Sequence, residues 1–549
     1  MVAKIVLFLN NMIMLFTISE QDFYLYVLKD FYIAYNLKTV FAMFKTPFLA
    51  YNGVVASENP LASVTGVKIL MNGGNAFDAT IAASFTLAVT QPHLGGLGGD
   101  FFALFYSADQ GKIYCLNSSG WAPKKLTIEF LKNLGYREMP TFSPFSVTVP
   151  GLVAGLNELH RKFGSIEFSE LLKDPISFAE NGFPVYWSLS HAIEFGAKNL
   201  ADEGFRENYL INGRPPKVGE ILKQKNLAEV LKSIAREGPD VFYSGWIAEE
   251  IVSYLNREEE VFSVSDFSDF KPEWCKPIST TYHNVRVYEI PPNSMGATTL
   301  LMLNMLEELN LKNIDPFSEK RIRLMTEVAK LAYRERDNQL SDPRFINIDL
   351  AKFISKSFAQ ELLKEIPQSV KNMKLSNGDT TYFAVADKDG NIVSAIQSLF
   401  HPFGSRIVVK SLGIPLNNRG SYFKFEGPNK LEPRKRSLHT LSALLLEDDE
   451  GVFAALGASG GDFRPQQHAL FVSNIVDYEM SIWEALEAPR FLWDGEKILV
   501  EEGYKITNNE IYVKLKYPGR TGVAQGIYKK DKTLIGVSDV RGDGLPCGY

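Results

Sequence analysis

The sequence predicts an α+β protein, and three observations support that prediction. Residues 380–387 and 391–398 form two strand patterns joined by a tight turn, which indicates an antiparallel hairpin. Helical periodicity recurs in several segments outside the hairpin. The chain of 549 residues is 45% hydrophobic and 22% charged, which is typical of a globular protein with a large core.

The first strong helical pattern covers residues 75–89. Asn75 and Asp78 form an N-cap pair that resembles a capping box, and apolar residues then cover almost every face. We therefore predict a buried helix. The glycine-rich loop 94–99 that follows has neither the Lys-Ser/Thr pair of a P-loop nor GxGxxG spacing. We interpret it as a place where backbone segments pack closely.

Further helices are predicted where apolar residues recur at helical spacing. Their ranges are 174–182, 226–236, 247–256, 298–309 and 319–336. Residues 342–379 form the least patterned stretch and end in Asn377-Gly378-Asp379. We expect a loose, solvent-accessible segment there.

The hairpin pattern after this stretch sets two hydroxyl groups opposite each other. Residues 387–391 read Asp-Lys-Asp-Gly-Asn, which suits a type I turn followed by a left-handed glycine at Gly390. The hairpin then closes with Asp387 opposite Asn391. Counting back along both strands places Thr380 opposite Ser398, at a cross-strand spacing of about 4.5–5.5 Å.

Thr380 could act as a nucleophile if cleavage of the chain made it the first residue of a new chain. A threonine hydroxyl is a weak nucleophile, but a threonine at a chain start has its own α-amine as a base, with a pKa of about 7.7–8.0. Ser398 could then hold that amine or the hydroxyl. The alternative is that both are ordinary strand residues.

Gly460-Gly461 lies between a predicted strand (452–456) and a predicted helix (464–475), with Asp462 as the expected N-cap. Adjacent glycines allow backbone N–H groups to approach a substrate closely, and a helix start favours developing negative charge. These two features predict an oxyanion-binding loop. The alternative is a simple turn.

Together these segments resemble the γ-glutamyltransferase family of N-terminal-nucleophile hydrolases, which also includes a cephalosporin and glutaryl acylase-like branch. The resemblance covers most of the chain. It is carried by residues 73–79, 90–93, 95–100, 147–151, 380–390, 416–420, 439–441 and 460–462.

The resemblance implies a four-layer αββα sandwich and a precursor that cuts itself between Asp379 and Thr380. Residues 46–379 would form a large subunit and residues 380–549 a small subunit, which stay associated as a heterodimer. Thr380 would attack an amide carbonyl, with Gly460 and Gly461 as the oxyanion hole. We expect no cofactor or metal, because the seven histidines are scattered and the three cysteines lack ligand spacing.

The substrate residues depart from the γ-glutamyl pattern of the family. Trp121 stands before Ala-Pro, where the family has an arginine that binds the α-carboxylate. Arg419 and Tyr422 replace residues that bind the α-amine, and His439 and Thr440 replace the paired serines. Arg419 is therefore predicted to bind the terminal carboxylate of a dicarboxylic acyl chain such as glutaryl, unless it is a solvated surface arginine. His439 either donates to the substrate or positions the loop.

The predicted function is a self-processing γ-glutamyl amide hydrolase or transferase of the glutathione type. A glutaryl or cephalosporin acylase-like amidohydrolase is the alternative within the family, and an inactive binding or scaffold protein is the alternative outside it. The expected partner is a small-molecule acyl amide. The net charge of −6 argues against a nucleic-acid partner.

Residues 1–45 form an N-terminal extension that has no counterpart in the resemblance. The stretch from Ile5 to Ile18 is apolar but is interrupted by two asparagines and is too short to span a membrane. Three interpretations are open: an over-long start with Met43 as the initiator, a secretion or anchor segment, and an added structural element. We expect a cytoplasmic protein without membrane partners, with a secreted or anchored protein as the alternative.

Overall fold

The computed structural model describes residues 4–9, 12–17, 45–199, 202–366, 373–376, 378–507 and 509–549. Contacts divide the chain into an N-terminal unit, residues 1–44, and a main unit, residues 45–549. In the N-terminal unit, β1 (Lys4–Leu9) pairs antiparallel with β2 (Met12–Thr17). Among the described residues, no helix combines the length and apolarity that crossing a membrane requires.

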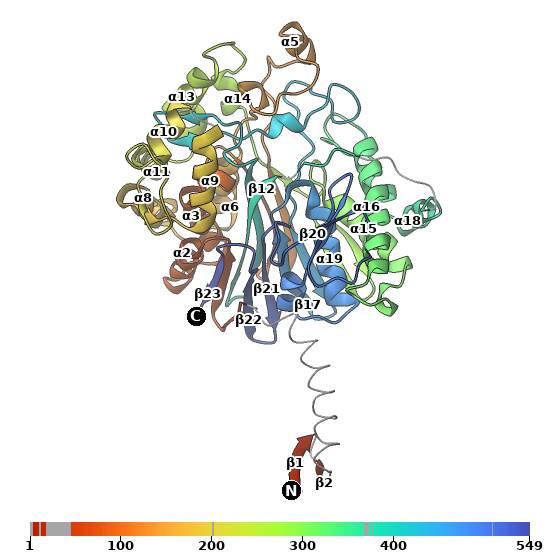
Figure 1. The fold of residues 1–549 in the computed structure, drawn as a ribbon. Helices are drawn as coiled ribbons and strands as arrows, with labels where there is room; N and C mark the ends of the chain where they lie inside the picture. Colours follow the sequence, from red (N-terminus) through yellow and green to blue (C-terminus); the bar gives the residue numbers. More distant parts are fainter. Residues whose placement is uncertain are drawn as a thin grey trace. The chain divides into compact units, whose positions relative to one another are not determined.

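The main unit contains two large sheets of antiparallel strands (Figure 1). The nucleophile sheet, named for Thr380, has the order β23 (Leu545–Gly548), β4 (Gly53–Ser57), β12 (Asp379–Asp387), β13 (Ile392–Phe400), β5 (Asp100–Ser107), β6 (Lys112–Ser118), β9 (Glu273–Cys275). The second sheet has the order β10 (Ile278–Tyr282), β11 (Val285–Glu289), β16 (Leu444–Asp448), β17 (Gly451–Ala458), β21 (Ala524–Lys530), β22 (Thr533–Ser538), β3 (Phe48–Ala50). Smaller sheets pair β7 (Phe183–Pro184) with β8 (Ile221–Leu222), β14 (Val408–Val409) with β15 (Ile414–Pro415), and β18 (Phe491–Trp493) with β19 (Ile498–Glu501) and β20 (Tyr512–Leu515).

Helices cover the outer face of each large sheet, so that the main unit has four layers (Figure 1). Against the nucleophile sheet lie α2 (Pro60–Met71), α3 (Ala76–Thr90) and α6 (Leu152–Phe163), with α4 (Pro92–Gly95), α5 (Ile128–Asn133), α7 (Phe168–Leu171), α8 (Lys173–Asn181), α9 (Trp187–Asn199), α10 (Glu203–Tyr209), α11 (Lys225–Glu237), α12 (Val241–Ser244), α13 (Trp246–Leu255) and α14 (Val264–Ser268) around them. On the second sheet lie α15 (Gly296–Glu308), α19 (Arg464–Val476) and α20 (Ile482–Glu487), with α16 (Glu319–Gln339), α17 (Leu350–Phe353) and α18 (Lys356–Leu363) nearby.

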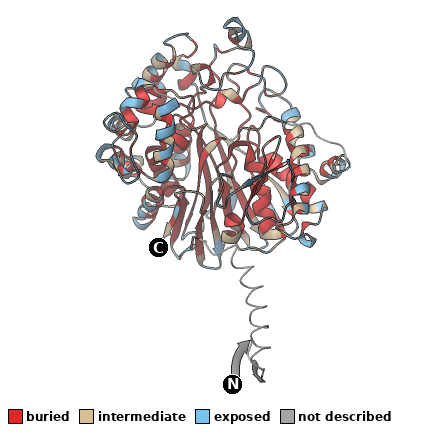
Figure 2. Cartoon of the chain, viewed as in Figure 1, coloured by how far each residue is buried: buried red, intermediate tan, exposed pale blue. Residues whose placement is uncertain are grey.

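Strand alternation explains why the two sheets pack face to face. Along β12, Ala384 and Ala386 join the apolar cluster between the sheets, whereas Phe383 and Val385 join the cluster beneath the helices. Successive strand residues point to opposite faces, so an uninterrupted apolar strand requires a cover on both sides. Figure 2 shows the result, with buried strands in the centre and exposed residues on the outer helix faces. The predicted four-layer class is confirmed.

The helix predictions agree with the structure in most places. Helix α3 has Asn75 as its N-cap, both bonds of the capping box with Asp78 are present, and every residue of the helix is buried. The other predicted helices correspond to α8, α11, α13, α15 and α16. The stretch 342–379 is less open than expected, because α17 and α18 lie within it.

The glycine-rich loop 94–99 packs closely, as predicted. A Cβ atom on Gly98 would lie 2.2 Å from the carbonyl oxygen of Pro415, and one on Gly99 would lie 2.5 Å from that of Ser398. Only glycine allows such close approach of backbone to backbone. The loop therefore supports the β13 end that carries Ser398.

Candidate active site

Thr380 lies near the start of β12, at a register shift in the hairpin between Asp379 and Thr381. Its Oγ1 donates to Ser398 Oγ at 3.1 Å, and both side chains are buried. The hairpin closes as predicted, with Asp387 N bonded to the Asn391 carbonyl and Gly390 in the left-handed region at φ +93°. The turn therefore sets the register that brings the two hydroxyls together.

Ser398 also contacts the peptide bond that self-cleavage would break. Its hydroxyl donates to the Asp379 carbonyl oxygen at 2.9 Å and accepts from Phe400 N at 2.8 Å. A donor on a carbonyl oxygen stabilises the negative charge that develops there during attack. One serine thus contacts both the candidate nucleophile, Thr380, and the bond that Thr380 would attack.

The Gly460-Gly461 loop joins β17 to α19 in a conformation that requires glycine. Gly460 has φ +134° and Gly461 has φ +55°, and both lie in the left-handed region that side chains disfavour. A Cβ atom on Gly461 would lie 2.2 Å from Gly378 N. The loop therefore touches the linker directly before Thr380.

Asp462 does not cap helix α19, so that prediction was wrong. The residue before the helix is Phe463, which makes no side-chain cap. Asp462 instead accepts hydrogen bonds from Arg336 Nη1 at 2.8 Å, Tyr422 OH at 2.5 Å and Ser376 N at 2.6 Å. A buried carboxylate next to a buried guanidinium forms a stronger interaction than a helix cap does.

The linker residues before Thr380 lie over this loop and over Phe400. Asp462 N donates to the Ser376 carbonyl at 3.0 Å, which makes a reciprocal pair with the Ser376 N bond. A Cβ atom on Gly378 would lie 2.9 Å from the Phe400 ring. The uncut linker therefore covers Gly461 and Phe400 before any cleavage has occurred.

A cavity of about 670 Å³ opens beside the Asp379–Thr380 bond. Its lining includes Glu58, His93, Ser188, His191, Glu194, Lys198, Asp379, Thr380, Ser459, Gly460, Arg520, Gly522, Arg541 and Gly542. Part of the lining comes from α9 and part from residues 519–523 and 541–542. Its volume lies in the range of small-molecule sites.

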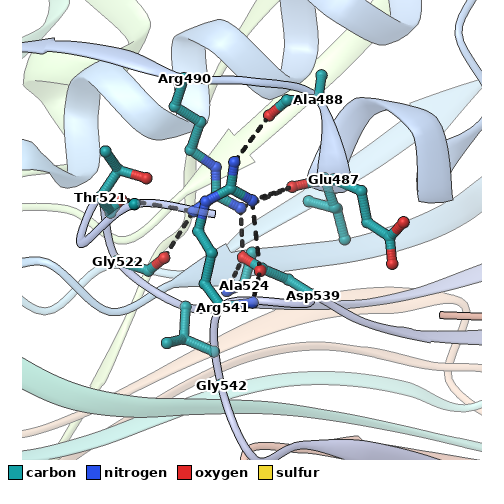
Figure 3. A network of polar contacts seen from close by, with 12 residues as sticks. Glu487, Ala488, Arg490, Thr521, Gly522, Ala524, Asp539, Arg541 and Gly542 are labelled. Carbon is teal, nitrogen blue, oxygen red and sulfur yellow. Dashed lines mark hydrogen bonds and ion pairs between the residues drawn. The ribbon is translucent and has the colours of Figure 1, made fainter. Parts of the chain in front are cut away.

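A network of buried charges holds the C-terminal wall of this cavity (Figure 3). Arg490 donates to Asp539 at 2.5 Å and to the Gly522 carbonyl at 2.7 Å. Arg541 donates to Glu501 at 2.8 Å and to the Ala488 carbonyl at 3.1 Å. Figure 3 shows both guanidinium groups converging on Asp539. Arg490 thereby holds the backbone of Gly522, which lines the cavity together with Arg541 and Gly542.

The four predicted substrate residues form a buried cluster instead of a solvated surface. Arg419 is fully buried, its Nη1 donates to Thr440 Oγ1 at 2.9 Å, and its guanidinium lies 4.2 Å from the Phe400 ring centre. Burial lowers the pKa of Arg419 to about 10. The surface-arginine alternative is therefore wrong. Tyr422 lies beside Arg419 and is bonded to Asp462, as described above.

His439 is a neutral donor in the same cluster. Its Nε2 lies 2.9 Å from Asp100 Oδ2, and its Nδ1 accepts from Leu441 N. Burial, followed by the charge of Arg419, lowers the pKa of His439 to about 3. The imidazole therefore holds Asp100 in position. Asp100 also accepts a hydrogen bond from Gly120 N at 2.7 Å.

A comparison with known protein families shows to which family this chain belongs. The sequence model of gamma-glutamyltranspeptidase matches residues 62–549. The chain belongs to the γ-glutamyltranspeptidase family. Its catalytic members are hydrolases and transpeptidases, and the chain also matches solved structures of that fold over most of its length.

Individual relatives in the γ-glutamyltranspeptidase family have different names. The glutathione hydrolase-like YwrD proenzyme of Bacillus subtilis is 35% identical over 90% of this chain and 98% of its own. The acylase ACY 1 proenzyme of a Pseudomonas species is 31% identical over 91% and 94%. The crystal structure of a cephalosporin acylase from Bacillus halodurans is 31% identical, with a TM-score of 0.86 over 92% and 97% of the two chains. The acyl group is therefore not determined by family membership.

The structure places four of the predicted site residues around the Asp379–Thr380 bond and the other four in the buried cluster around Arg419. Thr380 and Gly460 line the cavity, and Ser398 contacts Thr380 directly. Gly461 lies under the linker. Arg419, Tyr422, His439 and Thr440 form the buried cluster, linked to Ser398 through Phe400.

Glu58, which sequence reasoning missed, lies at the cavity immediately after β4. Its carboxyl group is buried, and Oε2 has no hydrogen-bond partner among the described residues. Burial, and then the nearby carboxyl groups of Asp379, Asp543 and Asp539, raise its pKa well above the usual value. An acidic residue directly after a fully buried strand was the available signal.

We predict that Glu58→Gln stabilises the protein more at pH 8 than at pH 5. The pKa of Glu58 is raised in the folded chain, so from about pH 4.5 upward the unfolded chain releases a proton that the folded chain retains, and stability falls as pH rises through this window. Glutamine does not titrate, so the Glu58→Gln variant does not lose stability in this way as the pH rises. Thermal melts of the Thr380→Ala precursor should show a gain in Tm larger by about 1–3 °C at pH 8.

Glu194→Gln, on the exposed wall of the same cavity, is the matched control and should show no such difference. Lys45, whose charge interacts with that of Glu58, has a pKa that burial lowers from its usual value. An equal effect of Glu58→Gln at both pH values would contradict the assignment.

Proposed function

We propose that this chain is a self-processing amidohydrolase or acyltransferase that works through an acyl-threonine intermediate on Thr380. The observation that carries the proposal is the hydroxyl pair of Thr380 and Ser398 at 3.1 Å, at the wall of a cavity that Gly460 also lines. A nucleophile, a polarising donor and a glycine loop are the parts that acyl transfer needs.

The first reaction is the cleavage of the chain itself. Thr380 Oγ1 attacks the Asp379 carbonyl carbon, the C–N bond breaks, and the nitrogen takes a proton to become the α-amine of Thr380. Water then hydrolyses the resulting ester and leaves a new carboxylate on Asp379. Ser398 assists by donating to the Asp379 carbonyl oxygen.

Turnover repeats this chemistry on a substrate. The free α-amine of Thr380 takes the hydroxyl proton as Oγ1 attacks the amide carbonyl, and the same proton is passed to the departing amine. Water or a second amine then removes the acyl group. Residues 46–379 and 380–549 act together as large and small subunits, because β12 and β4 are neighbours in one sheet.

Two acyl groups are candidates for the substrate. Glutaryl is favoured by Arg419 and Tyr422, since neither offers a free carboxylate to bind a substrate ammonium group. γ-Glutamyl of the glutathione type is the second candidate, because a relative at 35% identity has the name glutathione hydrolase-like. Both carry a carboxylate at the same distance from the amide, and they differ by the ammonium group.

A side-by-side assay with glutaryl and γ-glutamyl anilides separates the two candidates. We expect a KM for the γ-glutamyl anilide that is roughly 10-fold or more above that of the glutaryl anilide, because the ammonium group would lie near the buried positive charge of Arg419. The measurement uses the cleaved protein at one pH and one salt concentration. A micromolar KM for glutathione would instead establish γ-glutamyl transfer as the function.

A further inference from the structure

Two free cysteines face each other at one edge of the nucleophile sheet. Cys115 lies on β6 and Cys275 lies on β9, and the two residues are direct partners in the antiparallel register. Strand β9 is the edge strand on this side of the sheet. Residues directly opposite each other in an antiparallel pair point to the same face of the sheet, so the two thiols lie next to each other.

The packing on the two faces of the sheet agrees with this register. Cys115 and Cys275 both pack in the apolar cluster between the two large sheets. The next pair along the strands, Leu116 and Trp274, packs in the cluster beneath the helices on the opposite face. Cys115 is fully buried and Cys275 is half-buried, so a small solute can reach Cys275 from the edge of the sheet.

The spacing of an antiparallel pair fits a disulfide. Directly opposite residues have Cα atoms about 4.5–5.5 Å apart, and disulfides span Cα distances of about 4.4–6.8 Å. The Cβ atoms, which start about 4.5–5.5 Å apart, have to come about 1 Å closer. Strand β9 has three residues and is followed by Lys276-Pro277, so the backbone that has to move is a short edge segment.

We propose that Cys115 and Cys275 are a site of oxidative modification, at which a peroxide converts the two thiols into a cross-strand disulfide. The sulfur of Cys275 attacks one oxygen of hydrogen peroxide, the O–O bond breaks, and the products are a sulfenic acid and water. The sulfur of Cys115 then attacks the sulfur of Cys275. The S–S bond forms, the S–O bond breaks, and the departing hydroxide takes the proton of Cys115 and leaves as water. The peroxide accepts the two electrons that the two sulfurs lose.

The burial of the two thiols makes this modification slow to form and slow to reverse. Burial raises the pKa of both thiols, that of Cys275 to about 11. Little thiolate is therefore present near pH 7, and the thiolate is the reactive form. Thiols of high pKa are also poor leaving groups, so reduction of the bond by another thiol is slow. The disulfide thus acts as a lasting constraint and not as a rapid switch.

The disulfide would hold β9 at a point that also contacts the segment of the substrate cluster. Glu273, at the start of β9, forms an ion pair with Arg436 at 2.7 Å between Oε2 and Nη1. Arg436 precedes His439 by three residues. Both cysteines lie within residues 46–379, so the bond would stay inside the large subunit and would not join the two subunits.

Peptide mass spectrometry of the purified full chain tests this proposal before and after hours in millimolar hydrogen peroxide. Free thiols are alkylated in denaturant, and the chain is digested without a reductant. We expect the treated protein to yield linked peptides that contain Cys115 and Cys275. Recovery of both residues as alkylated thiols, or as sulfinic or sulfonic acids, would overturn the proposal.

Cys547 is the matched control for this experiment. It is half-buried on β23, at the opposite edge of the same sheet, and its partner across the strands is Val55. We expect Cys547 to stay outside any disulfide under the same treatment. A linked peptide that joins Cys547 to either of the other cysteines would show that proximity in the register does not determine the pairing, and would overturn the proposal.

Thermal melts give a second measurement. Peroxide should raise the Tm of the unchanged protein by about 2–4 °C relative to its effect on Cys275→Ser, because the bond closes the long segment between residues 115 and 275. Cys547→Ser should behave like the unchanged protein. Equal Tm changes in Cys275→Ser and the unchanged protein would contradict the proposal. If Cys275→Ser does not fold, the linked peptides of the unchanged protein decide, since that measurement requires no variant.

Discussion

Replacing Thr380 with alanine should leave the purified protein as one uncut chain without amidase activity. The substitution removes the only hydroxyl that lies within hydrogen-bonding distance of Ser398 Oγ among the described residues, and with it both the cleavage and the acyl intermediate. Loss of a nucleophile costs on the order of 10⁴-fold or more in turnover. Denaturing gels and intact mass would show one chain of 549 residues, whereas the unchanged protein should yield a fragment that begins at Thr380.

Neighbouring hydroxyls provide the controls for this experiment. Thr380→Ser keeps a hydroxyl and should retain part of both cleavage and turnover. Thr381→Ala should retain most of both, because Thr381 pairs with Gln397 and not with Ser398. Ser398→Ala should slow cleavage without abolishing it, since it removes a donor but not the nucleophile. Full activity in Thr380→Ala would refute the assignment.

The contact between Thr380 and Ser398 was predictable because local chemistry determines it. The Asp-Lys-Asp-Gly-Asn turn sets the hairpin register, and the register alone brings Ser398 to Thr380. The positive φ angles at Gly460 and Gly461 likewise belong to the loop itself. Such features depend on residues close in sequence, or on strand pairing that follows from a single turn.

The substrate cluster was less predictable because its contacts join distant segments. Nothing near Arg419 in sequence indicates that this side chain is buried. The sequence also does not indicate that the charge of Arg419 acts on Arg464, a residue of another element, and lowers the pKa of Arg464. Asp462 satisfied every local criterion for a helix cap, yet Arg336 and Tyr422 bind it instead. Long-range charge pairing overrides local preference when both partners are buried.

The Arg336–Asp462 pair carries the second large predicted effect, which is on stability. Asp462→Asn removes the charge that compensates a buried guanidinium, and it also places an amide N–H against either Ser376 N–H or the Arg336 and Tyr422 donors. Breaking a buried ion pair costs about 3–5 kcal/mol. In a chain of this size, we expect a Tm lower by roughly 3 °C or more, measured on the uncut Thr380→Ala background.

Asp337 offers a matched control, because it binds the same arginine from the solvent side. Its Oδ1 lies 2.7 Å from Arg336 Nε, but its side chain is 45% exposed, compared with 1% for Asp462. Exposed pairs contribute about 1 kcal/mol or less, so Asp337→Asn should barely change the Tm. Equal losses from the two variants would show that Arg336 does not depend on its buried partner. In chains that keep Thr380, Asp462→Asn should also slow self-cleavage, because Ser376 would lose the carboxylate that holds the linker in front of Gly461.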